Sequence, residues 1–165
     1  MITPAYAQTM AAYTAEMNRR FYAAAARLSD AERKSDRGAF FRSLHGTLAH
    51  LVWADHMWMS RFAGWDKPAV NQRQSPTLYP DFADLHEART QTDARLIAWT
   101  DTLTQDWLDQ DLAWFSGSLQ REQRQSRALL VVHMFNHATH HRGQAHALLT
   151  AMGEDTGDTD LPFVL

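Results

Sequence analysis

The sequence predicts an all-α protein: a four-helix bundle with a long loop between the second and third helices and an irregular crossover before the last helix. Apolar residues recur at intervals of three and four in four long segments, which is the spacing of one helix face. Capping residues, prolines and glycines mark the ends of these segments. Of the 165 residues, 45% are hydrophobic, which is enough for one core. We therefore expect residues 1–165 to form a single domain.

The first half of the chain predicts two helices. Thr3-Pro4 is a typical helix start, because threonine is a good N-cap and proline suits the first helical position, and this helix ends near Leu28. The order Ser29-Asp30-Ala31-Glu32 has the spacing of a capping box and predicts a short turn. The second helix is expected from about residue 36 to residue 62. Residues 63–80 contain three prolines and form the long loop.

The third helix is predicted to begin at Pro80-Asp81, and its apolar seam is interrupted by Arg89 and Thr92. One interpretation is that these two residues face a polar cavity, in which Arg89 holds an anionic substrate. The alternative is that the seam bends towards solvent at this point.

The last third of the chain predicts a crossover and a fourth helix. Residues 104–120 contain aromatic residues without a helical period, which indicates an irregular crossover or a short hairpin. The fourth helix is expected to begin at Glu122 or Ser126 and to end at Met152, with Gly153 as its C-terminal stop.

Composition excludes several classes of protein. The chain contains no cysteine, so it forms no disulfides and no thiolate metal site, and any thiol in its chemistry must arrive as a substrate. Neither a signal peptide nor a run of about 18 apolar residues occurs, so we expect a cytoplasmic protein without a membrane partner. A net charge of −3 with scattered basic residues argues against nucleic-acid binding.

Histidines are concentrated in the predicted fourth helix, at positions 133, 137, 140 and 141. Residues four apart lie on the same helix face, so His133 with His137, or His137 with His141, could bind one metal ion. The apolar residues of this helix define its core-facing side. His141 falls within that side and His137 at its edge, whereas His133 and His140 rotate towards solvent. The pattern therefore favours the pair His137 and His141.

A third ligand should come from another helix, because catalytic zinc commonly has three protein ligands. The second helix offers His45, His50 and His56. His50 lies nearly opposite the bulky apolar side of this helix, in a stripe that includes Gly46. Such a stripe indicates either a cavity wall or a polar surface, and periodicity alone does not select His50.

The chain resembles the DinB-like family of metal-binding helical bundles over nearly its whole length. The residues that carry the resemblance are Ser43-Leu44-His45-Gly46-Thr47-Leu48-Ala49-His50-Leu51-Val52-Trp53-Ala54-Asp55 with Trp58, Asn136-His137, His140-His141-Arg142-Gly143-Gln144, and Gly153 before Thr159-Asp160-Leu161-Pro162. The resemblance implies a metal site made of His50, His137 and His141. The family shares only a historical name with a DNA polymerase, and no polymerase activity is implied.

The resemblance also implies chemistry of the kind seen in thiol-dependent transferases. Three imidazoles suit Zn²⁺ or Ni²⁺ and leave a coordination position open for a water or a low-molecular-weight thiol. We therefore expect a metal-dependent thiol S-transferase or hydrolase that acts on a small electrophilic substrate; the alternative is a non-catalytic metal-binding stress-response bundle. Glu-x-x-His repeats, a zinc-protease helix motif and a Gly-rich phosphate loop are all missing from the sequence.

Several other residues carry weaker expectations. Arg142 and Gln144 could orient the metal ligands through hydrogen bonds, although Arg142 is rotated away from His141 and could instead tie helices together. Gly143 is expected to permit close helix packing. The aromatic residues Trp65, Trp107 and Trp114 could form the contact of a homodimer or could cover the protein's own core.

Overall fold

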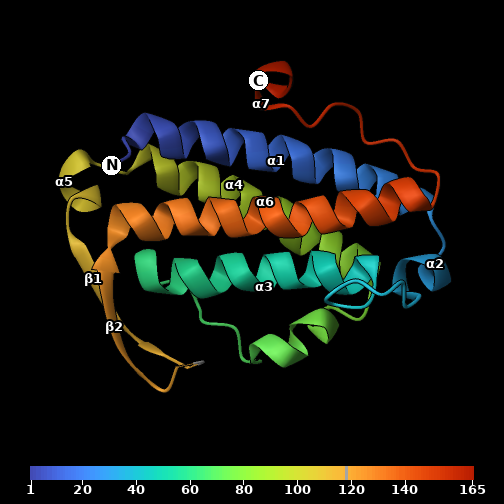
Figure 1. Cartoon of the computed structure of the whole chain (residues 1–165), viewed down its shortest axis with the longest axis horizontal. Coiled ribbons are helices and arrows are strands. Elements are labelled where there is room, and N and C mark those ends of the chain that lie inside the picture. The colour runs from blue at the N-terminus through green and yellow to red at the C-terminus, as the bar shows by residue number, and fades with distance from the viewer. Residues whose placement is uncertain (118) are drawn as a thin grey trace.

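Four long helices run side by side in the computed structural model, which describes residues 1–117 and 119–165 (Figure 1). Each helix contacts two of the others, in the cyclic order α1, α4, α3, α6, so the four form a bundle. They are α1 (Pro4–Arg27), α3 (Leu44–Phe62), α4 (Phe82–Asp101) and α6 (Arg127–Ala151). The shorter elements are α2 (Asp30–Lys34), η1 (Gln72–Thr77), α5 (Gln105–Leu108) and α7 (Leu161–Val164).

Local capping explains where most of the helices begin and end. The side chain of Thr3 accepts a hydrogen bond from the backbone of Tyr6 at the start of α1, and Ser126 does the same for α6. The predicted capping box at Ser29 is present and begins α2. Gly153 has φ +83°, a left-handed conformation that glycine adopts without strain, and it ends α6 as predicted.

The expected start of the second helix near residue 36 is wrong. Residues 35–43 are not helical, and α3 begins only after Ser43, which caps it. Gly38 and Arg42 both have positive φ values, and Ala39 and Arg42 form an isolated β-bridge, so this segment folds back on itself. It packs beside the first turns of α3, where a Cβ on Gly46 would lie 2.6 Å from the carbonyl oxygen of Phe41.

The crossover before α6 is a β-hairpin, one of the two forms expected for it. Strands β1 (Asp111–Ser116) and β2 (Arg121–Ser126) pair antiparallel, with Trp114 opposite Gln123. The hairpin extends from the bundle end at which α1 begins (Figure 1). The long loop of residues 63–80 contains the 3-10 helix η1, which packs against α3.

The core consists of two apolar clusters at different levels of the bundle. One contains residues from the C-terminal half of α1 and the first half of α3, including Phe21 and Leu48, and the other includes Met59 and Phe135. Trp65, Trp107 and Trp114 are partly buried against the second cluster, so they cover the protein's own core. Among the described residues, no helix has the length and apolar character needed to cross a membrane.

Candidate metal centre

His50 lies in the middle of α3 and is buried, with 1% of its surface exposed. The alternative of a polar surface position is therefore wrong. Its Nδ1 lies 2.9 Å from the hydroxyl oxygen of Ser75 in η1, and that hydroxyl donates to the carbonyl oxygen of Gln72 at 2.7 Å. Because the Ser75 hydrogen is used in this way, Ser75 accepts from the Nδ1–H of His50. The ring therefore presents Nε2 as an unprotonated nitrogen.

His137 and His141 lie one turn apart on α6 with ring centroids separated by 4.5 Å. The Nε2 atoms of His50 and His137 are 3.5 Å apart, and the ring centroids of His50 and His141 are 4.8 Å apart. One nitrogen from each of the three rings lies within 4.8 Å of the others. Two helices that are distant in sequence thus bring together the three residues that the family resemblance implies. These three residues, the histidine group, could hold a metal ion.

Gln144 contacts His141 as expected. Its Oε1 lies 2.8 Å from Nδ1 of His141, so it accepts the Nδ1–H and leaves Nε2 of this ring free. Arg142 points elsewhere and ties two helices together, since its guanidinium donates to Thr14 on α1 and Thr139 on α6. Nothing lies within 4 Å of a Cβ added to Gly143, so the expectation of close helix packing there is wrong.

The electrostatics of the group keep all three rings neutral. Burial, with His141 and His137 nearby, lowers the pKa of His50 to about 3. Burial, together with the neighbouring histidines, lowers the pKa of His137 to about 4. Burial also lowers the pKa of His141. At neutral pH the group therefore consists of three uncharged bases with lone pairs.

The residues present fit a divalent transition metal ion. Neutral imidazole nitrogens are ligands that Zn²⁺ and Ni²⁺ accept. Two nitrogens bound at zinc–nitrogen distances to one tetrahedral ion are about 3.3 Å apart, close to the 3.5 Å between His50 and His137. Within the described part of the chain, the group contains three histidines and no carboxylate. A bound ion would thus keep at least one coordination position that no member of this group fills.

Aromatic residues surround the histidine group. The ring of Phe41 stacks on His50 with centroids 3.8 Å apart and lies 5.2 Å from the ring of His141. On another side, Trp53 stacks on His50 at 5.5 Å. These rings limit the access of water, which accounts for the low pKa values and strengthens electrostatic interactions in the group.

Four of the other histidines have different environments. Nε2 of His45 lies 2.6 Å from the carbonyl oxygen of Tyr79, and Nε2 of His56 lies 3.0 Å from the hydroxyl of Thr92. His133 packs against the ring of Trp58, and His146 packs against Phe21. None of these four belongs to the histidine group, as the periodicity of α6 indicated for His133.

Arg89 and Thr92 are buried, with 2% and 1% of their surfaces exposed, so the interpretation that the seam bends towards solvent is wrong. The guanidinium of Arg89 binds Asp55 at 2.6 Å and Asp93 at 2.8 Å. Its charge is thus matched inside the bundle, and the expectation that Arg89 holds an anionic substrate is not supported. The cluster is completed by Asn18, which donates to Asp93 at 2.9 Å.

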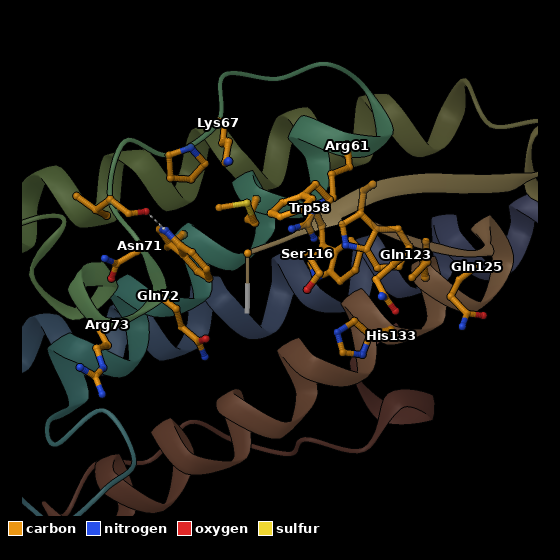
Figure 2. A pocket seen from close by; sticks show the side chains of 18 of the residues that line it. Trp58, Arg61, Lys67, Asn71, Gln72, Arg73, Ser116, Gln123, Gln125 and His133 are labelled. Atoms are coloured by element: carbon orange, nitrogen blue, oxygen red, sulfur yellow. Dashed lines mark hydrogen bonds between the residues drawn. The ribbon is translucent and has the colours of Figure 1, made fainter. Parts of the chain in front are cut away.

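A cavity of about 1210 Å³ lies beside the histidine group, bounded by α3, the loop after it, the β-hairpin and the first turns of α6 (Figure 2). Two residues of its wall also touch the metal centre. Trp53 stacks on His50, and the ring of His133 lies 5.9 Å from that of His137. The sequence did not indicate this cavity, because segments that are far apart in the chain form its walls. Ser75 was missed as well, although Asn71 and Gln74 have the spacing of the capping box that begins η1.

Comparison with known proteins gives a match at the level of the family. The model of the DinB family matches residues 1–165, which is the whole chain. No curated protein and no solved structure matches the chain.

Proposed function

The chain belongs to the DinB family, and on this premise we propose that it binds one divalent metal ion through His50, His137 and His141 and acts as a metal-dependent enzyme on a small electrophilic substrate. The observation that carries the proposal is the convergence of three neutral imidazoles in a largely dry site without a carboxylate. Each neutral imidazole has one unprotonated ring nitrogen at pH 7, and one divalent cation can bind the lone pairs of all three rings.

The residues around the ligands support a site prepared for an ion. Ser75 and Gln144 accept the Nδ1–H groups of His50 and His141, which selects the tautomer that presents Nε2. Zn²⁺ and Ni²⁺ are the proposed ions, because imidazole suits both. When bound, such an ion supplies Lewis-acid chemistry that activates a water or a thiol for attack.

Two features favour an enzyme over a non-catalytic metal-binding bundle. The histidine group offers three ligands, whereas structural zinc sites have four, and a large cavity lies beside it. The reaction we favour is transfer of a low-molecular-weight thiol to the electrophile, with hydrolysis as the second candidate. The chain has no cysteine, so the thiol would be a second substrate.

Metal analysis tests the first part of this proposal. Protein purified without an affinity tag should contain about one equivalent of Zn²⁺ or Ni²⁺ after loading and dialysis. His50→Ala, His137→Ala and His141→Ala should each lose it, and the control His133→Ala should keep it, because His133 lies outside the group. Retention of the ion in the three variants, or its loss only with His133→Ala, would overturn the ligand assignment.

Turnover by the loaded protein tests the second part. The zinc and nickel forms should catalyse the reaction of a small thiol with 1-chloro-2,4-dinitrobenzene, in which the thiolate replaces chloride, or the hydrolysis of p-nitrophenyl acetate, and His141→Ala should not. A protein that binds the metal but accelerates neither reaction type across a panel of thiols and electrophiles would favour the non-catalytic bundle.

A further inference from the structure

The cavity beside the metal centre has an unusual balance of charge. Arg61, Lys67 and Arg73 line it, and the described residues of its wall include no aspartate and no glutamate. The chain as a whole has more acidic than basic residues, 19 against 16. The imbalance in the wall is therefore local and makes the cavity attractive to anions.

The hairpin contributes to this imbalance by the direction of its side chains. Gln123 and Gln125 of β2 line the cavity. Arg124 between them and Glu122 before them do not. Successive side chains of a strand point to opposite faces, so the charged positions of β2 are directed away from the cavity and the amides into it. Figure 2 shows both glutamines near His133, across the cavity from Lys67.

Arg61 is the cation that the structure holds in place. Its guanidinium lies over the ring of Trp58 at 4.6 Å and near that of Trp114 at 5.8 Å, and Arg61 and Trp58 lie together in Figure 2. Stacking of this kind restrains the plane of the guanidinium and leaves its N–H groups free at the edge. Burial lowers the pKa of Arg61, and no carboxylate among the described residues opposes this effect.

The contrast with Arg89 shows what Arg61 lacks. Arg89 is buried and forms ion pairs with two carboxylates. Arg61 is half-buried beside two indole rings and has no carboxylate partner among the residues that the structure describes. A half-buried guanidinium can bind a supplied carboxylate through two parallel hydrogen bonds. The missing partner would therefore come from a ligand.

The shape of the wall indicates the rest of that ligand. Trp53, Trp58 and Trp114 provide flat apolar surfaces, and Trp53 and His133 are shared with the metal centre. We propose that the cavity binds a carboxylate-bearing organic molecule with a flat apolar body, with Arg61 as the residue that selects the carboxylate. This inference rests on the proposed function, because the ligand it names would be the substrate of the metal centre.

A matched pair of probes tests this selection. Binding of 2-naphthoate and of its neutral analogue 2-naphthamide is measured by titration calorimetry, with the zinc-loaded and with the metal-free protein. We expect 2-naphthoate to bind at least about tenfold more tightly than 2-naphthamide in both forms. A difference of this size corresponds to one charge-assisted hydrogen-bonded pair. The preference should shrink as salt is added.

Variants then locate the source of the preference. Arg61→Gln should bind the two probes equally, and Arg61→Lys should retain part of the preference, because it keeps the charge but not the planar fork. The control Arg19→Gln, on the exposed side of α1, should behave as wild type. Equal binding of both probes by wild type, or a preference that survives Arg61→Gln, would overturn the proposal.

The two metal states separate this inference from the proposed function. A carboxylate preference that occurs only in the zinc-loaded protein and survives Arg61→Gln would mean that the ion itself binds the anion, which overturns the role of Arg61 and supports the metal site. An Arg61-dependent preference in a protein that fails to retain zinc would leave the anion site standing and remove the proposed metal function.

Discussion

Two clusters of buried polar residues lie in the same bundle, and α3 contributes to both. His50 belongs to the histidine group, and Asp55, five residues later, belongs to the cluster around Arg89. In the second cluster, Arg89 binds two carboxylates, and the pKa of Arg89 is raised because the attraction of Asp93 and Asp55 outweighs the effect of burial. In the histidine group, burial lowers all three pKa values, and the members are neutral bases, of which His50 and His137 approach each other to 3.5 Å through their Nε2 atoms. A neutral imidazole supplies no counter-charge to another.

The difference separates a cluster whose cation is ion-paired by its own members, the Arg89 cluster, from one that needs a ligand. Buried polar groups are costly unless they are paired, so the Arg89 cluster is explained by its own members. Ser75 and Gln144 satisfy the outer nitrogens of His50 and His141, whose inner nitrogens face the rest of the histidine group. We infer that the first cluster specifies the packing of α3 on α4, and that the second is built for a cation.

The largest expected effect on stability concerns the Arg89 cluster. Arg89→Met leaves two carboxylates buried without a cation, so we expect the free energy of unfolding to fall by about 3 to 5 kcal/mol. Urea denaturation of the metal-free protein measures it. The control Arg19→Met removes an exposed ion pair with Glu16 and should leave the midpoint nearly unchanged. If Arg89→Met is as stable as wild type, the cluster does not stabilise the fold.

A smaller effect is expected from the support of His50. Ser75→Ala removes the acceptor of the Nδ1–H, so the ring loses its preferred tautomer and orientation, and the affinity for Zn²⁺ should fall about 10- to 100-fold. Competition with a chelating dye measures this change. The hydroxyl of Ser60 donates to a backbone carbonyl elsewhere on α3, so Ser60→Ala is a matched control without an expected effect. Equal affinities for all three proteins would mean that Ser75 has no part in the site.

The smallest effect is a dependence of stability on pH in the metal-free protein. The pKa of His50 is about 3 in the folded state against about 6.5 in the unfolded chain, so below pH 6.5 the unfolded state binds the extra proton. The contribution of neutral His50 to the free energy of unfolding is therefore fully present above pH 6.5. It is lost as the pH falls, by about 1 kcal/mol between pH 6.5 and 5.5.

Urea denaturation at both pH values, for wild type and His50→Gln, isolates this contribution. His137 and His141 also have lowered pKa values and remain in both proteins, so the difference between the two slopes reports His50. Parallel pH profiles would show that His50 titrates in the folded protein as it does in the unfolded chain.

Local patterns in the sequence determined the four long helices, except for the start of α3, and one face of α6. The caps at Thr3 and Ser29 and the stop at Gly153 were predicted correctly, because each depends on interactions within a few residues. Ser126, one of the two starts expected for the last helix, caps α6. His137 and His141 were paired from their spacing and from the apolar side of α6, and a helix brings such residues together by itself.

Only the tertiary structure decided the surroundings of His50 and the role of Arg89. Periodicity shows which side of a helix is apolar, but it does not show what covers the opposite side. In this protein Gly46 allows residues 39–43 to approach α3 closely, and η1 covers the same side and brings Ser75 to His50. Arg89 likewise became a structural residue only because Asp55, 34 positions away, lies within 2.6 Å of it. Contacts across such separations depend on how the chain packs, and no local pattern records them.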